Sequence, residues 1–289
     1  MQRLWGNVIL VLLAALVIAS CGEKRERGRG ADEGSRKEVI TQKGSDTMIL
    51  LAQRWSEAYA KKHPEIQVQV TGGGSGTGIS ALINGTTEIA NASRPMKEEE
   101  RKQVREKFGG DVVEIPVAKD GIAIYVNESN PLEQITVEQV RDIYFGKVKN
   151  WKEVGGPDQD IILYGRENSS GTYEFFKEHV LDKGDFAPQT QTMPGTSAVV
   201  NAVSKDKGGI GYGGEAYTQG VKQLKLSGGG GEAVAPTEEN IRSGAYPLSR
   251  NLFFYLKSAP AGATKDYVDW VLGPEGQAEV KAAGYFPLN

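Results

Sequence analysis

The sequence of 289 residues is poor in the side chains that most often carry catalysis and metal binding. It has one cysteine, Cys21, and two histidines, His63 and His179. A single cysteine excludes a disulfide within the chain, and no Cys/His cluster has the spacing of a metal site. Both histidines occur in charged, helix-like stretches, where a surface position is a better interpretation than a general base. We therefore expect no metal, no cofactor and no enzymatic activity.

An excess of basic residues is also missing. The formal net charge is −3, and removing residues 1–20 takes away only Arg3, which leaves −4. This balance does not favour a nucleic-acid partner. The hydrophobic share of 39% and the charged share of 25% are ordinary for a globular chain, and its length allows one large domain or two of ordinary size.

Only one long apolar run is present, "VILVLLAALVIA" from Val8 to Ala19. It is short for a membrane span and has the length of a signal-peptide core. It leads into "IASC", which resembles the lipobox of bacterial lipoproteins and ends at Cys21. The alternative is an ordinary signal peptide with a chance cysteine. We expect residues 1–20 to be a lipoprotein signal peptide and Cys21 to be lipidated, with the protein anchored to a membrane outside the cytoplasm.

The segment after Cys21, "GEKRERGRGADEGSRKE", is dense in charge and glycine. It cannot bury enough apolar surface to fold, so residues 21–38 are predicted to be a flexible linker. From residue 39 onward, β-like runs alternate with amphipathic helices. This order predicts an α/β fold with a largely parallel sheet. The expected strands are 38–46, 66–70, 87–93, 161–166 and 208–214, and the expected helices are 48–59, 78–86, 97–110, 136–151, 170–181 and 265–284.

Two further segments are predicted to cross between parts of the fold. In "PVAKDGIAIYVN" (116–127) a strand is expected to break at Lys-Asp-Gly and resume, and "SGAYPLSRNLFFYL" (243–256) is expected to return. The middle of the chain would then be an insertion. We expect lobe I to comprise 39–117 plus 248–289 and lobe II to comprise 118–247, with a two-stranded hinge between them.

Three loops share one plan, in which a strand ends, small and hydroxyl residues follow, and a helix begins. A helix start presents free N–H groups and a positive dipole end, both of which suit an anion. Any one loop is explained equally well by helix capping, but three of them are harder to explain that way. The loops are "KGSDTM" (43–48), "TGGGSGTG" (71–78) and "GRENSSGTY" (165–173).

The third loop adds a charge. Arg166 stands four residues before Ser170, and the planar guanidinium suits bidentate contact with phosphate oxygens. Motifs of nucleotide enzymes and esterases do not fit these loops. "GGGSGTG" lacks the Lys-Ser/Thr ending of a P-loop, and Thr77 stands where a nucleophile elbow needs its second glycine.

Together, "GSDT", "GGGSGTG" and "R-x-x-x-S-G-T", with "LEQITVEQVRDIYFGKVKNW", "GGIGYGG" and "YPLSR", resemble the PstS family over essentially the whole folded chain. These are the binding proteins of the phosphate ABC importer. The resemblance implies the two-lobed periplasmic-binding-protein fold (type II), inorganic phosphate as ligand, ABC permease subunits as partners and a monomeric protein. The residues that it implies for phosphate binding are Ser45, Asp46, Thr47, Ser75, Ser93, Arg166, Ser170, Gly171 and Thr172, and we add Arg94 to the expected site from its position after Ser93.

One position departs from the best-known form of the family. In "ANASRP", Ser93 is followed by Arg94, where the family has an aspartate that accepts a hydrogen bond from protonated phosphate and repels sulfate. Arg94 either adds a cation to the pocket, which we favour from its strand-end position, or points to solvent or an acidic neighbour. Asp46 is a possible replacement acceptor, although the N-cap of the following helix is its more ordinary role.

Other functions on the same fold stay open. They are a phosphate sensor or scavenging lipoprotein without a transporter, and a binder of another tetrahedral oxyanion such as sulfate. A phosphate-ester hydrolase is a more distant alternative, because the catalytic groups that it needs are missing.

Overall fold

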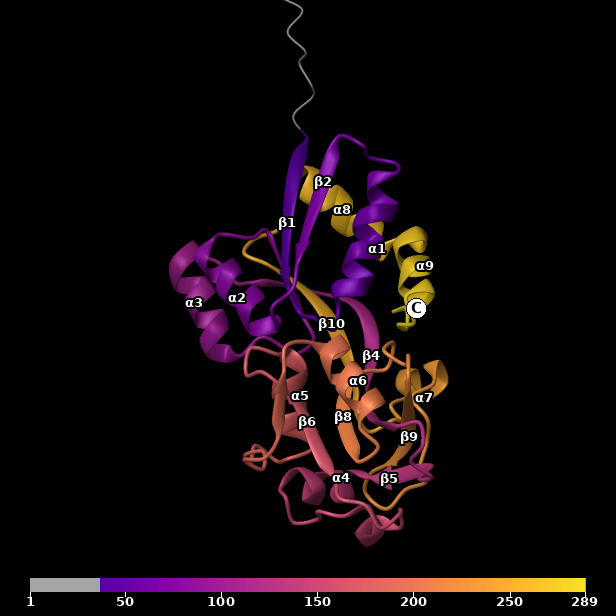
Figure 1. The fold of residues 1–289 in the computed structure, drawn as a ribbon. Coiled ribbons are helices and arrows are strands. Elements are labelled where there is room, and N and C mark those ends of the chain that lie inside the picture. The colour runs from indigo at the N-terminus through magenta and orange to yellow at the C-terminus, as the bar shows by residue number, and fades with distance from the viewer. Residues whose placement is uncertain (1–36, 289) are drawn as a thin grey trace, which may run out of the picture. The chain divides into compact units, whose positions relative to one another are not determined.

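The computed structural model describes residues 37–288 (Figure 1). The predicted signal peptide, Cys21 and most of the predicted linker lie outside the described residues. Within residues 37–288, none of the helices combines the length and apolar character that a membrane span requires. Residues 37–288 belong to one compact unit.

Strands and helices alternate along the described chain, so the α/β class is confirmed. The strands are β1 Glu38–Gly44, β2 Ile66–Thr71, β3 Ile89–Ala92, β4 Val113–Asn127, β5 Gln134–Thr136, β6 Ile162–Arg166, β7 Gln191–Met193, β8 Gly209–Gly214, β9 Val221–Ser227 and β10 Ser249–Leu256. The helices are α1 Ile49–Ala60, α2 Ser75–Asn84, α3 Glu98–Phe108, α4 Val137–Tyr144, a 3-10 turn Trp151–Val154, α5 Gly171–His179, α6 Thr196–Lys205, α7 Glu238–Ser243, α8 Gly262–Leu272 and α9 Pro274–Ala282.

The sheet is mixed rather than largely parallel, with the order β2-β1-β3-β10-β4-β8-β6-β7. Strands β1, β2 and β3 are parallel to one another, as are β6, β7 and β8 where they pair. The two strands in the middle, β10 and β4, run antiparallel to each other and to their outer neighbours. The strand-helix-strand pattern predicted the parallel pairs correctly but missed the antiparallel centre. That centre forms because β4 and β10, which are far apart in the sequence, are neighbours in the sheet, and a local pattern carries no information on such pairing.

Strand β4 is continuous from Val113 to Asn127, so the predicted break at Lys-Asp-Gly is wrong. Its first part pairs with β10, and from Ile122 onward it pairs with β8. The residues expected to interrupt it stay in the ladder because β10 continues alongside, with Arg250 directly opposite Asp120. Figure 1 shows β4 and β10 between two groups of helices. One group comprises α1, α2, α3, α8 and α9, and the other comprises α4, α5, α6 and α7.

Two predicted helices end earlier than expected. The stretch 136–151 forms α4 only as far as Tyr144, and the turn Trp151–Val154 follows separately. The stretch 265–284 forms two helices, because Gly273 ends α8 and Pro274 begins α9 at a position where proline is well tolerated.

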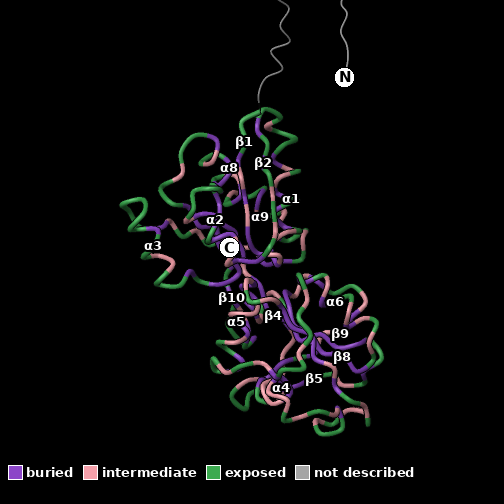
Figure 2. Tube along the Cα trace, turned by 60° about the vertical axis from the view of Figure 1, so that its left-hand side comes forward, coloured by how far each residue is buried: buried purple, intermediate pink, exposed green. Residues whose placement is uncertain are grey.

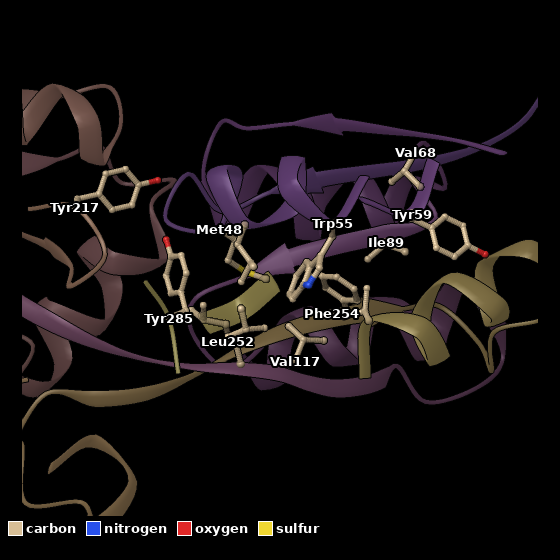
Figure 3. Close-up of a cluster of buried hydrophobic side chains, with 14 of the residues drawn as sticks. Met48, Trp55, Tyr59, Val68, Ile89, Val117, Tyr217, Leu252, Phe254 and Tyr285 are labelled. Carbon is tan, nitrogen blue, oxygen red and sulfur yellow. The ribbon is translucent and has the colours of Figure 1, made fainter. Parts of the chain in front are cut away.

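One apolar cluster combines side chains of the first and last parts of the chain, packed against α1, α8 and α9, with others from residues between 117 and 221. Burial is most continuous along the central strands, while the outer helix faces and many of the loops are exposed (Figure 2). Within this cluster, Trp55 is fully buried and meets Phe254 edge-on with ring centroids 5.5 Å apart. Its indole N–H donates to the Gly276 carbonyl at 2.8 Å. Figure 3 shows Trp55 and Phe254 beside Met48, Leu252 and Val117.

A second apolar cluster is drawn almost wholly from residues 122–248, with Trp151, Phe176 and Tyr212 among its buried members. The aromatic rings of Phe176 and Tyr212 stack with centroids 3.9 Å apart. This cluster includes residues of β6 and β8 and packs α5 against them through Phe175 and Phe176.

A buried polar group lies where β4, β8 and β10 meet. Asp120 and Arg250 form an ion pair of 2.6 Å, and both side chains are almost completely buried. Burial raises the pKa of Asp120, although the charge and hydrogen bonds of Arg250 oppose that effect. Glu215 follows β8, and burial, together with repulsion from Asp120, raises its pKa from 4.5 to about 8.

We expect Trp55→Ala to lower the free energy of unfolding by about 3–5 kcal/mol, because the substitution leaves a cavity and removes a buried hydrogen bond. Urea denaturation monitored by circular dichroism measures this change. Leu50→Ala is the control on the same helix, since Leu50 is 44% exposed, and its effect should stay within about 0.5 kcal/mol. Equal effects at the two positions would contradict the packing described.

The raised pKa of Glu215 predicts a pH dependence of stability. Between 4.5 and about 8 the folded protein holds a proton that the unfolded chain releases, so stability falls as pH rises through this window. Glu215→Gln has no proton to lose and should show a smaller fall. Thermal unfolding at a series of pH values checks this, and parallel curves for both proteins would show that Glu215 is not the titrating group.

Candidate functional site

The loop after β1 places two hydroxyls in a buried position. Ser45 and Thr47 are almost completely buried, and the Ser45 N–H donates to the Asn91 carbonyl at 2.9 Å. The Ser45 hydroxyl donates to Ser93 Oγ at 3.0 Å. Because β1 and β3 are parallel neighbours, their carboxyl ends bring Ser45 and Ser93 to the same edge of the sheet.

The glycine-rich loop after β2 adds a third serine. Gly74 has a φ of +90°, and α2 begins at Ser75, which is fully buried. Ser75 Oγ accepts from the Ser93 N–H at 3.0 Å and lies 3.4 Å from Ser93 Oγ. The hydroxyls of Ser45, Ser75 and Ser93 therefore form one buried serine cluster at the carboxyl ends of β1, β2 and β3.

The start of α5 lies against this serine cluster. Ser170 is the N-cap and accepts from the Tyr173 N–H at 3.2 Å. A Cβ atom on Gly171 would lie 2.2 Å from Ser75 Oγ and 2.7 Å from Ser93 Oγ, so only glycine allows this approach. The Gly76 N–H also donates to the Ser169 carbonyl at 2.9 Å. Two helix starts, those of α2 and α5, thus meet at the serine cluster.

Arg166 ends β6 and is buried beside Asp46. Its Nη2 donates to Asp46 Oδ2 at 2.8 Å, and its Nη1 donates to Thr196 Oγ1 at 3.0 Å. Glu167 accepts further hydrogen bonds from the same guanidinium. The guanidinium is thus directed at the loop after β1, although the two segments are far apart in the sequence.

Asp46 is not the N-cap of α1, and that expectation is wrong. The helix begins at Ile49, and the capping position is Met48, which makes no side-chain capping bond. The carboxylate of Asp46 accepts from the Gly73 N–H at 2.8 Å as well as from Arg166. It therefore joins the first two loops to the third.

The hydroxyls of Thr47 and Thr172 lie 2.8 Å apart, and both residues are almost completely buried. Arg250 donates to both, at 3.4 Å to Thr47 Oγ1 and at 3.1 Å to Thr172 Oγ1. Sequence reasoning missed Arg250 and its partner Asp120 as neighbours of the site. The available signal was a charged residue within the largely apolar stretch "LSRNLFFYL".

Arg94 is directed away from these hydroxyls. Its Nη1 and Nη2 donate to the two carboxylate oxygens of Glu100 at 2.8 and 2.7 Å, and Nη1 also donates to the Pro95 carbonyl. Burial works against ionisation of Glu100, but the hydrogen bonds and charge of Arg94 lower its pKa overall. Of the two orientations considered from sequence, this arrangement matches the one toward an acidic neighbour.

The histidines lie apart from this cluster of loops. The His63 ring stacks on Tyr59, and the His179 ring stacks on Phe175. Among residues 37–288, no group of three or more His, Cys, Asp or Glu side chains is placed to hold a metal ion. The arrangement supplies N–H, hydroxyl and guanidinium donors in a buried place, which suits the binding of a small anion.

Comparison with known proteins agrees with this geometry. Residues 31–275 match the family model of the PBP superfamily domain. The chain is 35% identical to "Phosphate-binding protein PstS" of Staphylococcus epidermidis, covering 95% of this chain and 86% of that protein. It is 36% identical to the protein of the same name from Pseudomonas aeruginosa, covering 85% of this chain and 81% of that protein.

Solved structures are similar as well. A putative phosphate ABC transporter substrate-binding protein with bound phosphate, from Clostridium perfringens, has a TM-score of 0.79 at 29% identity, covering 87% of this chain and 100% of that chain. An ABC-type phosphate transport receptor from Vibrio cholerae has a TM-score of 0.70 at 31% identity, covering 86% and 99%. By sequence and by fold, the chain belongs to the PBP superfamily and, within it, to the PstS family.

Proposed function

We propose that this protein binds inorganic phosphate outside the cytoplasm and delivers it to the permease of an ABC importer. The observation that carries the proposal is the convergence of buried donors from four loops. The serine cluster, Arg166, the threonine hydroxyls and the starts of α2 and α5 all face one small region. The similarity to proteins named for phosphate supports the same ligand.

Hydrogen bonds to a charged group contribute about 1.5–3 kcal/mol each, so a few of them support micromolar or tighter binding. Because the chain as a whole is mildly negative, attraction of an anion has to come from these local donors. Their burial strengthens each one, since little water screens them.

The proposed binding residues are the ten expected from sequence. Nine of them lie in the loops described above, and Arg94 is the exception, since its donors are directed at Glu100 and Pro95. We keep Arg94 in the proposed set only as a neighbour of Ser93. Its guanidinium would have to leave Glu100 to meet an anion.

We further propose that lobe I (39–117 plus 248–289) and lobe II (118–247) separate to admit the ligand, with β4 and β10 as the hinge. Several contacts join the lobes in the present arrangement, and opening would break them. Among them are the Gly76 to Ser169 backbone bond, the Asp46–Arg166 ion pair and the Thr47–Thr172 hydroxyl pair. The bond from Arg250 to Thr172 Oγ1 is another.

The proposal also includes a lipid anchor on Cys21 after removal of residues 1–20, and a monomeric protein without catalytic activity. The support for the anchor is the apolar run Val8–Ala19, which only Ser20 separates from the cysteine. A sensor or scavenger role would use the same site without a permease.

Titration calorimetry of the purified protein with phosphate, sulfate and a phosphate monoester tests the ligand. Gly171→Ala tests the site, because its Cβ would fall on Ser75 Oγ. We expect this variant to bind phosphate at least tenfold more weakly. Gly110→Ala is the matched control, since its Cβ meets nothing within 4 Å.

Absence of phosphate binding by the wild-type protein would overturn the proposed function. Equal phosphate affinity in the two alanine variants would instead show that the anion binds somewhere other than the start of α5.

Selectivity for phosphate over sulfate is expected to depend on Asp46. Phosphate keeps a proton near neutral pH and can donate it to a carboxylate, whereas sulfate has none and is repelled. Asp46→Asn keeps the shape of the side chain and removes the charge, so the ratio of phosphate to sulfate affinity should fall at least tenfold. Calorimetry with both anions measures the ratio.

Asp111→Asn is the control for loss of one negative charge, because Asp111 is 80% exposed and pairs only with Arg105 in the described contacts. If Asp46→Asn leaves the ratio unchanged, Asp46 has no part in selectivity.

A further inference from the structure

Arg250 is a buried cation in the centre of the sheet. It is not among the ten binding residues expected from sequence. It lies on β10 directly opposite Asp120 of β4. Its Nε and Nη2 donate to Asp120 Oδ2 at 2.9 and 2.6 Å. This pair fixes the guanidinium in one orientation, beneath the loops that follow β1 and β3.

The remaining N–H groups of Arg250 reach both of those loops and the first turn of α5. Nη1 donates to the Ser93 carbonyl at 3.0 Å and to Thr172 Oγ1 at 3.1 Å, and Nη2 donates to Thr47 Oγ1 at 3.4 Å. A guanidinium has five N–H donors, and each of these has an acceptor. One side chain therefore contacts the segments that hold Thr47, Ser93 and Thr172, which are drawn from both proposed lobes.

These contacts constrain the direction of the two threonine hydroxyls. Each hydroxyl has one proton and two lone pairs, and Arg250 fills one lone pair on each oxygen. The hydroxyls lie 2.8 Å apart, so one of them donates to the other. The receiving oxygen then has both lone pairs filled, and its proton is free to be donated only outward.

Stability alone does not account for the Asp120–Arg250 pair. Replacing a buried ion pair with apolar residues is often neutral or stabilising, because desolvation offsets the attraction. In addition, Asp120 Oδ1 is buried without a hydrogen-bond partner. The backbone ladder of β4 and β10 already continues through both residues, so the strands do not need this pair in order to align.

We infer that Arg250, held by Asp120, is a positioning residue for anion binding. It leaves one of the two hydroxyls, the one that accepts from the other, free to donate only outward, and it couples Thr47 and Thr172 to the closed arrangement of the loops. This inference rests on the proposed binding of phosphate. It assigns to β10 a part in ligand binding beyond the hinge.

A double-mutant cycle on phosphate affinity tests the inference. The variants are Arg250→Gln, Thr172→Val and the combination of both, measured by calorimetry on the same protein. Each single change should weaken phosphate binding at least tenfold. If Arg250 acts through the Thr172 hydroxyl, the second change should add little to the first. The phosphate affinity of the double variant should then lie within threefold of that of the single variant that binds phosphate less tightly.

Arg54→Gln is the control for loss of a guanidinium, because Arg54 pairs with Glu279 on the surface and should keep wild-type affinity. Losses that multiply in the double variant, or wild-type affinity in Arg250→Gln, would overturn the inference while leaving phosphate binding in place. Lack of binding by the wild-type protein would instead overturn the proposed function.

Arg250→Lys serves the same cycle if Arg250→Gln does not fold. A lysine keeps the charge opposite Asp120, but one nitrogen cannot bond Asp120 and both threonines together. Thermal unfolding separates a loss of folding from a loss of binding. We expect Arg250→Lys to stay folded and still bind phosphate at least fivefold more weakly. A folded Arg250→Lys with wild-type affinity would count against the inference.

Discussion

The contact between the start of α5 and the serine cluster is the constraint on which the rest of the site depends. Gly171 brings a helix N-terminus within reach of Ser75 and Ser93, at a distance that no side chain at that position would allow. The same contact places Ser169 on the glycine-rich loop and Thr172 on Thr47. Once α5 is in this position, the free N–H groups of two helices and several hydroxyls necessarily share one buried region.

Burying so many donors together is costly unless each has an acceptor. In the described residues, three buried arginines each meet a carboxylate: Arg94 with Glu100, Arg166 with Asp46 and Arg250 with Asp120. The site therefore does not hold an uncompensated positive charge. Attraction of an anion would come from directed dipoles, namely helix starts and hydroxyls, and Arg250 constrains two of those hydroxyls, on Thr47 and Thr172.

The local parts of this arrangement could be predicted from sequence. The loops around Ser45, Ser75 and Ser170 are each read from a few neighbouring residues, because strand ends, glycines and helix caps have short-range signals. Nearly all the expected strands and helices of the first half are present within a few residues. The elements β5, β7, β9, α6 and α7 were missed. Three of them, β5, β7 and α7, have only three to six residues, and so short a segment carries little periodic signal.

Long-range pairings could not be predicted in the same way. Asp120 and Arg250 meet because of the register between β4 and β10, and the Lys-Asp-Gly segment was interpreted as a break for lack of that partner. The orientation of Arg94 had a readable signal in Glu100, which also accepts from the Lys97 N–H at the start of α3. A glutamate at a helix start near an arginine is an ordinary surface pair, so the sequence alone does not decide whether Arg94 pairs with Glu100 or faces the pocket. The hydrogen bonds in the structure decide it.

The pairing of Arg94 changes the question of selectivity. If Arg94 faced the serine cluster, the added positive charge would favour doubly charged anions. Near neutral pH these include both sulfate and doubly ionised phosphate, so the charge would not distinguish the two. With Arg94 held by Glu100, that bias is removed. Discrimination then has to come from a group that senses the proton on phosphate, and Asp46 is a carboxylate already bound to Arg166 and to the glycine-rich loop. The pairing of Arg94 with Glu100 and the placement of Asp46 in the first loop thus act in the same direction, because the first removes a bias toward doubly charged anions, sulfate among them, and the second supplies an acceptor for the proton on phosphate.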